Sequence, residues 1–130
     1  SPVELPERAL LPGGELPLPE AGLTLRCSYT VYSDEIHSSL NTFFFNVEYL
    51  WYYNLYAEEG RRPHQLRGRG CTKKLSDLFA ERKLSAAERA LVPVIRDEAG
   101  PIAVCGFGTA ERVWPAPGEK ALRVDVIKNK

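Results

Sequence analysis

The sequence has few of the residues from which metal and catalytic centres are built. Its 130 residues include three cysteines, Cys27, Cys71 and Cys105, and two histidines, His37 and His64. The cysteines are widely spaced and form no C-x-x-C, which argues against a zinc site and against thioredoxin-type redox chemistry. A small, odd number of cysteines suits a reducing compartment, where such thiols are usually buried and inert. We therefore expect no metal ligands in this chain.

Motifs of nucleotide chemistry and nucleophilic catalysis are also missing. Neither G-x-x-x-x-G-K-[ST] nor G-x-S-x-G occurs in the sequence. Gly106-Phe107-Gly108 resembles the start of a dinucleotide-binding loop, but Glu111 takes the place of the third glycine, so we interpret it as a tight turn after a strand. A small hydrolase or transferase would have to depend on His64 and Cys71, for which no orienting partner is visible. The sequence thus predicts no catalytic centre.

Long apolar segments are absent as well. No apolar run approaches 18 residues, and the first residues, SPVELPERALL, lack the basic and apolar regions of a signal peptide. We expect neither a membrane span nor a signal peptide, and a cytoplasmic location.

Charge is balanced overall but divided along the chain. The net charge is zero, yet residues 1–60 hold two cations and nine acids, whereas residues 61–130 hold fifteen cations and eight acids. Eight of the cations lie within residues 61–83, beside two acids. Such a cluster is typical of a surface that binds a polyanion. The alternative is a solvated face whose charge is balanced by the acidic half of the chain.

The apolar pattern predicts an α+β domain that is mainly β. The segment 23–32 alternates, with Leu25, Cys27, Tyr29 and Val31 among the residues on its buried side. The other expected strands are 42–45, 93–97, 101–107 and 121–127, and 47–56 is interpreted as a helical turn followed by a strand. We expect a mostly antiparallel sheet, in a compact β-sandwich-like arrangement with two short helices.

Two helices and several loops are predicted from local signals. Thr72 is a suitable N-cap for a helix whose apolar stripe is Leu75, Leu78 and Phe79. Ser85-Ala86-Ala87-Glu88 is a capping box that begins a second helix. Residues 61–70 are expected to form a loop, because proline and glycine interrupt any periodicity.

Proline and glycine also set the expected domain boundary. Residues 1–22 predict an extended, edge-like lead-in with a turn at Pro12-Gly13-Gly14, and residues 23–130 predict a single domain. The aromatic residues are expected to form core rather than a platform for stacked bases; they are Phe43, Phe44, Phe45, Tyr49, Trp51, Tyr52 and Tyr53.

The basic stretch and the residues after it resemble a known family. In order, the sequence has Thr72-Lys73-Lys74-Leu75, Leu78-Phe79, Glu88-Arg89, Pro93-Val94, Gly106-Phe107-Gly108 and Glu111-Arg112. Their order and spacing over residues 67–113 resemble the C-terminal domain of bacterial tRNA(Ile)-lysidine synthetase. The family's R-x-R-x-x-G-D-R type segment corresponds to residues 54–66 here, where the aspartate is missing and Glu58-Glu59 stand where arginines are expected.

The resemblance carries several expectations. It implies a fold shared with a domain of phenylalanyl-tRNA synthetase, and a role in binding the acceptor stem of an isoleucine tRNA. The parent enzyme attaches lysine to an anticodon cytidine, using ATP and magnesium in an N-terminal catalytic domain marked by Ser-Gly-Gly-X-Asp-Ser. This sequence contains no such motif. The expected partners are therefore tRNA, that N-terminal domain and, in a homodimer, a second copy.

The resemblance also implies which residues contact RNA. These are Arg67, Arg69, Thr72, Lys73, Lys74 and Arg112, with Arg61 and Arg62 as weaker candidates. Arginine forks between glycines match phosphate oxygens, and a helix beginning at Thr72 would add unpaired N–H groups. The alternative function is a protein-interaction module whose basic half docks on an acidic partner.

Overall fold

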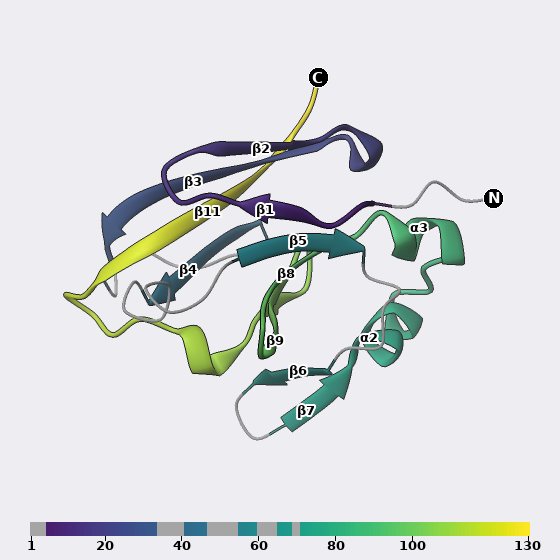
Figure 1. The fold of residues 1–130 in the computed structure, drawn as a ribbon. Helices are drawn as coiled ribbons and strands as arrows, with labels where there is room; N and C mark the ends of the chain where they lie inside the picture. Colours follow the sequence, from purple (N-terminus) through teal and green to yellow (C-terminus); the bar gives the residue numbers. More distant parts are fainter. Residues whose placement is uncertain (1–4, 34–40, 47–54, 60–64, 69–70) are drawn as a thin grey trace.

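Two antiparallel sheets make up the body of the domain in the computed structural model (Figure 1). The structure describes residues 5–33, 41–46, 55–59, 65–68 and 71–130, and for 59, 65–68 and 71–76 it describes the backbone alone. One sheet has the order β1-β5-β8-β9-β10, and the other has the order β2-β3-β11-β4. Within these ranges, no helix is long and apolar enough to span a membrane.

Each of the two sheets combines strands from distant parts of the chain. The first sheet holds β1 (Arg8–Leu10), β5 (Leu55–Glu59), β8 (Pro93–Asp97), β9 (Gly100–Val104) and β10 (Gly108–Thr109). The second holds β2 (Glu15–Leu18), β3 (Leu23–Val31), β4 (Thr42–Asn46) and β11 (Lys120–Lys128). The helices are η1 (Pro19–Ala21), α2 (Leu75–Glu81), α3 (Ala86–Ala90) and η2 (Glu111–Val113).

The two strands that alternate most clearly in sequence form the centre of the second sheet. β3 and β11 pair along their full length, from Leu23 opposite Lys128 to Val31 opposite Lys120. Leu25 and Cys27 are buried, as their spacing predicts, but Tyr29 and Val31 are 51% and 59% exposed. The expected burial of the last two was wrong, because the core between the sheets ends at Cys27 on this strand.

The aromatic run of β4 divides between the two faces of its sheet. Phe43 and Phe45 enter the core between the sheets, where they meet Ile95 and Ile102 of the facing sheet. Phe44 is buried outside that core, against Tyr32. The expectation that these residues form core is therefore confirmed for Phe43 and Phe45, while 47–54 lie outside the described residues.

The first residues supply an edge strand to each sheet. β1 pairs with β5, and β2 pairs with β3. Between them the predicted turn is present, with the N–H of Gly14 donating to the carbonyl of Leu11 at 3.2 Å. Leu10 and Leu18 are buried, so these edge strands contribute side chains to the interior.

A second, smaller core lies on the outer face of the β8–β9 hairpin. Phe79 of α2 packs there against Val94 and Val104. Its ring and that of Phe107 are packed edge to face, with their centroids 5.2 Å apart. Burial of one such aromatic ring contributes about 2–3 kcal/mol. The predicted apolar stripe is thus confirmed for Leu78 and Phe79, which fix α2 to the sheet, while the side chain of Leu75 is not described.

Two further local predictions are confirmed. α3 begins with the capping box, in which the Ser85 hydroxyl accepts from the N–H of Glu88 and the Glu88 carboxylate accepts from the N–H of Ser85. Gly106-Phe107-Gly108 is a turn between β9 and β10, with a positive φ of 84° at Gly106. That backbone conformation explains the glycine and fits the interpretation of the motif as a tight turn after a strand.

Candidate nucleic-acid interface

The basic stretch forms a small antiparallel hairpin rather than a loop. β6 (Gln65–Gly68) pairs with β7 (Cys71–Lys74), and Gly68 lies opposite Cys71, so only residues 69 and 70 join the strands. The expected loop over residues 61–70 was therefore wrong for β6. Gly68, one of the residues that predict an interruption from sequence, instead ends β6 directly before a two-residue connection.

The helix expected at Thr72 begins three residues later. Thr72, Lys73 and Lys74 are strand residues, and α2 starts at Leu75. The N-cap assignment of Thr72 was wrong, because strand pairing with Arg67 places this β-branched residue in a ladder. The two lysines consequently do not lie in a helical first turn, and the anion site expected at that helix start has no structural basis.

The register gives the hairpin two chemically different faces. Directly opposed residues share a face and neighbours along a strand alternate. Arg67 is opposite Thr72 and Gln65 is opposite Lys74, so these four positions belong to one polar face. The other face carries the positions of Leu66, Gly68, Cys71 and Lys73. Lys73 and Lys74, adjacent in sequence, thus belong to opposite faces.

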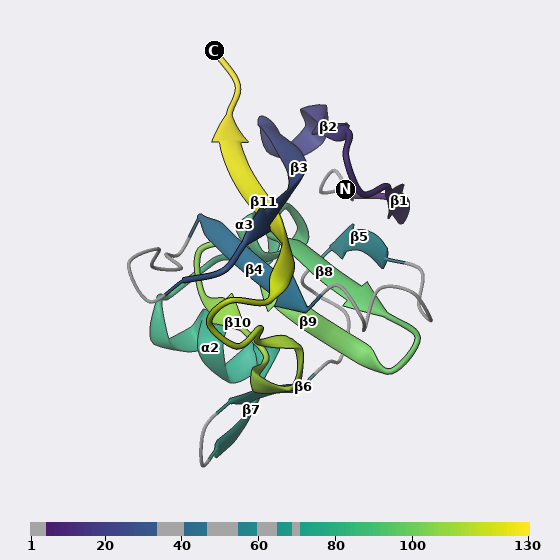
Figure 2. The same ribbon diagram turned by 90° about the vertical axis from the view of Figure 1, so that its left-hand side faces the viewer.

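The hairpin lies at one end of the molecule, outside the two sheets (Figures 1 and 2). β6 packs against β9 and η2, and β7 leads directly into α2. Arg61, Arg62, His64 and Arg69 lie outside the described residues, and the side chains of Arg67, Cys71, Thr72, Lys73 and Lys74 are likewise not described. The RNA contacts expected of these residues stay predictions.

Arg112 lies on η2, near the hairpin as expected, but its guanidinium is held by Asp97. Its Nη1 and Nη2 donate to the two carboxylate oxygens at 3.1 and 3.0 Å, and Nη2 also donates to the carbonyl of Gly100 at 3.2 Å. Asp97 is 1% exposed and also accepts from the N–H groups of Ala99 and Gly100. The pair therefore ties η2 to the β8–β9 turn.

Burial affects the ionisation of both partners. It raises the pKa of Asp97, although the bonds from Ala99 and Gly100 oppose the change, and it lowers the pKa of Arg112. Desolvation thus opposes the charged form on each side, so the pair stabilises the fold by less than its short distances suggest.

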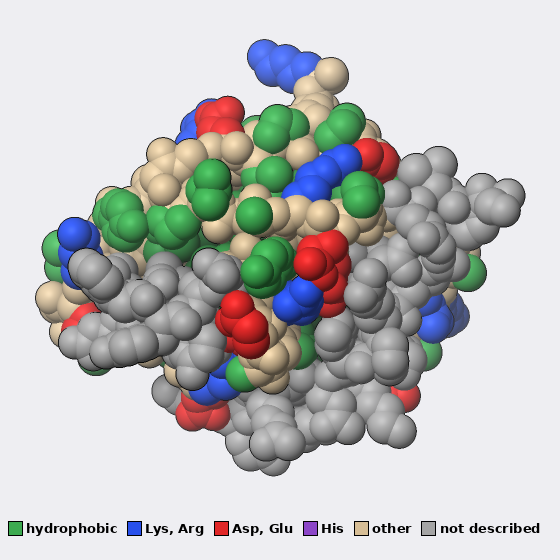
Figure 3. All heavy atoms as spheres, viewed as in Figure 1, with side chains coloured by type: hydrophobic (Ala, Val, Ile, Leu, Met, Phe, Trp, Pro, Cys, Tyr) green, Lys and Arg blue, Asp and Glu red, His purple; other side chains and the backbone are tan. Residues whose placement is uncertain are grey.

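Other described cations are also engaged within the domain. Arg96 donates to Glu58 at 2.8 Å and to Glu7, and it lies over the ring of Tyr56 at 4.7 Å. The guanidinium of Arg82 donates to the carbonyl of Gly106 and covers the ring of Phe107 at 4.0 Å. In Figure 3, blue and red side chains of the described residues are interleaved and form no single basic patch on this face.

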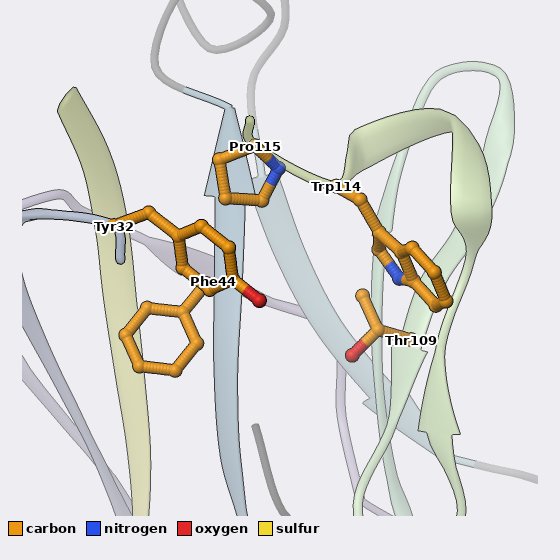
Figure 4. A pocket seen from close by; sticks show the side chains of 5 residues that line it. All are labelled: Tyr32, Phe44, Thr109, Trp114 and Pro115. Carbon is orange, nitrogen blue, oxygen red and sulfur yellow. The ribbon is translucent and has the colours of Figure 1, made fainter. Parts of the chain in front are cut away.

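A pocket opens on the other side of η2. Its described lining is Tyr32, Phe44, Thr109, Trp114 and Pro115, around a volume of about 200 Å³ (Figure 4). Sequence analysis singled out Phe44 of this group but missed the rest. The residues come from three distant segments, and no signal in the sequence brings them together.

Two comparisons identify the domain. Its fold is similar to a solved structure described as "Crystal structure of TILS C-terminal domain", with a TM-score of 0.80 and 22% sequence identity over 96% of this chain and 99% of that one. The fold is therefore that of the TILS C-terminal domain, mainly β with two antiparallel sheets and two short helices, as the sequence predicts.

The family is established by the sequence itself. Residues 56–126 match the family described as "TilS substrate C-terminal domain", and the chain belongs to that family. It is a domain of tRNA(Ile)-lysidine synthetase, an enzyme of tRNA modification. The resemblance noted over residues 67–113 lies within the matched range. No curated protein sequence matches the chain.

Proposed function

We propose that this domain binds tRNA and that the β6–β7 hairpin contacts the backbone of the acceptor stem. The observation that carries the proposal is the hairpin itself, which belongs to a tRNA-modifying enzyme's domain and has four cations within the eight residues 67–74. An A-form stem presents phosphates and 2′-hydroxyls more readily than base edges, so a narrow basic ribbon is a suitable partner.

The polar face of the hairpin is the side that we assign to RNA. It includes the positions of Arg67 and Lys74, whereas Lys73 shares its face with Leu66 and Cys71. An apolar face of a ribbon is expected to turn towards the body of the domain. β6 does pack against β9 and η2, which is consistent with that orientation.

The remaining parts of the function concern the parent enzyme. In this proposal an N-terminal domain holds ATP and magnesium and joins lysine to the anticodon cytidine, in the cytoplasm of a bacterium. The C-terminal domain fixes the far end of the tRNA, so that the anticodon reaches the catalytic domain. The residues of this chain contribute binding energy and no chemistry.

The test exploits the two adjacent lysines. If four to six phosphates are neutralised, the slope of log K against log salt should be about −3 to −5. Lys74→Ala should weaken binding of an isoleucine tRNA transcript and flatten that slope by about one unit, as should Arg67→Ala. Lys73→Ala, a matched control with the same change of charge, should have the smaller effect.

Filter binding at several salt concentrations measures these slopes, with heparin and an unstructured RNA as competitors. Equal displacement by heparin and tRNA would favour the rival function, docking on an acidic protein. An unchanged slope in all three variants would remove the hairpin from the RNA interface.

A further inference from the structure

The pocket beside η2 combines aromatic walls with polar groups that face its interior. On one side lie Tyr32 and Phe44, whose ring centroids are 5.3 Å apart with an interplanar angle of 60°. On the other side lie Trp114, which is 43% exposed, and Thr109 (Figure 4). Phe44 can reach this space because it faces away from the core that Phe43 and Phe45 fill.

Two hydroxyl groups point into the space between these walls (Figure 4). They belong to Tyr32 and Thr109, and neither has a hydrogen-bond partner within the part of the chain that the structure describes. A hydroxyl can both donate and accept, so the pair can satisfy the mixed donors and acceptors on the edge of a heterocycle. A simple apolar contact surface would not need them.

The size of the pocket suits one flat ring system. Its volume of about 200 Å³ lies below the roughly 300–1,000 Å³ of sites for drug-sized ligands. A cavity of roughly 150 Å³ is enough for a benzene ring. Stacking on tryptophan or tyrosine is the usual way in which proteins hold an unpaired base.

We propose that this pocket binds one unpaired nucleobase of the RNA held by the hairpin. The base stacks on Trp114, and its edge faces the hydroxyls of Tyr32 and Thr109. A paired base cannot enter, because its faces are covered by neighbours in the stem. The proposal deepens the proposed function and rests on it for the identity of the ligand as RNA.

The position of the pocket favours RNA over a peptide. η2 packs against both β6 and β4, so it lies between the basic hairpin and the strand that carries Phe44. The guanidinium of Arg123 lies 5.8 Å from the centre of the Phe44 ring, but its Nε donates to both carboxylate oxygens of Asp125, at 3.1 and 3.0 Å. The cations that would meet the phosphates of a nucleotide in the pocket are therefore those of the hairpin.

The experiment uses this chain with two RNA hairpins that share one stem. One ends bluntly and the other carries an unpaired 3′ extension of a few nucleotides. The extended RNA should bind more tightly, and Trp114→Ala should remove that gain, a loss of roughly 5- to 100-fold. Trp114→Ala should leave binding of the blunt stem and its salt slope unchanged, whereas Lys74→Ala should weaken both RNAs.

Three variants serve as controls. Trp114→Phe should restore most of the gain, because a smaller ring still stacks. Tyr29→Ala removes another exposed aromatic residue, on β3 and outside the described lining of the pocket, and should change nothing. Tyr32→Phe should keep the stacking but reduce discrimination among the four bases at the extension. Thermal unfolding of each variant confirms that it is folded.

A short single-stranded trinucleotide separates failure of this inference from failure of the proposed function. In a Trp51→Phe background, Trp114 is the remaining tryptophan and its fluorescence reports on the pocket. Quenching of Trp114 fluorescence by the trinucleotide without binding of the stem would support base binding in the pocket and refute stem binding by the hairpin. Equal affinity for the blunt and the extended RNA, with unchanged Trp114 fluorescence, would refute base binding in the pocket and support stem binding by the hairpin. Failure of all three RNAs would refute both.

Discussion

Replacing Arg112 should destabilise the fold rather than reduce RNA binding. The resemblance places this arginine among the RNA contacts, whereas the structure shows its guanidinium forked onto Asp97. Asp97 is 1% exposed, so Arg112→Ala would leave a buried carboxylate with the N–H groups of Ala99 and Gly100 as its remaining described donors. Arg112 cannot serve mainly in the fold and mainly in RNA binding, because a guanidinium that donates to two carboxylate oxygens and a carbonyl has few N–H groups left for a phosphate.

The expected magnitude depends on the burial of the pair. Breaking a fully buried ion pair costs about 3–5 kcal/mol, because the remaining charge is uncompensated. The Arg112 side chain is 34% exposed, and water can reach the carboxylate once it is gone, so we expect about 2–3 kcal/mol here. For a domain of 130 residues, this corresponds to a fall of about 10 °C in the midpoint of thermal unfolding.

The assay is a double-mutant cycle in thermal and urea unfolding. Asp97→Asn keeps a carbonyl oxygen for Ala99 and Gly100, so it isolates the charge interaction with Arg112. The double variant should be less destabilised than the two single changes together, with a coupling of about 1–2 kcal/mol. RNA affinity and salt slope should be unchanged for Arg112→Ala below its unfolding temperature. A midpoint within about 1 °C of the parent, together with a salt slope flattened by one unit, would refute this role and return Arg112 to the RNA interface.

Two further predictions concern the thiols and the response to acid. Burial raises the pKa of Cys27 to about 11 and that of Cys105 to about 12. Neither thiol should therefore react with a maleimide at pH 8 until the chain is unfolded. Mass spectrometry counts the labelled thiols, and rapid labelling of two or more in the native protein would contradict this. Hydrogen bonds from Ser85 lower the pKa of Glu88 from 4.5, so its contribution to stability is complete above about pH 4.5 and is lost as the pH falls through the lower folded-state pKa. Glu88→Gln keeps an acceptor in the capping box. Its midpoint of thermal unfolding should therefore fall less than that of the parent between pH 5 and pH 3. Identical pH profiles would contradict the assignment of this acid sensitivity to Glu88.

The parts of the fold that sequence predicts well are those decided by local chemistry. The strand at 23–31 is indicated by a period of two, and α3 is indicated by a capping box. Both signals act within a few residues, so no knowledge of distant partners is needed. The same holds for Gly106, where a positive φ explains the residue without reference to a ligand.

The β6–β7 hairpin shows why other parts could not be predicted. Its strands are four residues each, and Gly68 at the end of β6 indicates an interruption when only the sequence is considered. Thr72 satisfies the rules for an N-cap and for a strand equally well, and the choice is made by pairing with Arg67. Tyr29 and Val31 were misplaced for a related reason, because a strand's pattern does not reveal where the facing sheet ends.

The division of charge along the chain takes a different form in space. Arg96, from the basic half, bonds to Glu58 and Glu7 of the acidic half, so part of the charge division becomes internal ion pairs. Arg82 and Arg112 are held by backbone or carboxylate oxygens of the basic half itself. These three arginines thus have identified roles in holding the sheets and turns together.

The phosphate contacts of an RNA interface should therefore be concentrated in the hairpin rather than spread over the basic half. A concentrated site makes a sharper prediction than a diffuse one, because single changes at Arg67 or Lys74 should each remove a measurable part of the salt dependence. Neutralising Arg82 or Arg96 should instead lower the unfolding midpoint and leave the slope unchanged. If those two changes flatten the slope as much as the hairpin variants do, RNA binding depends on the net charge of the basic half and not on the placement of cations on the hairpin.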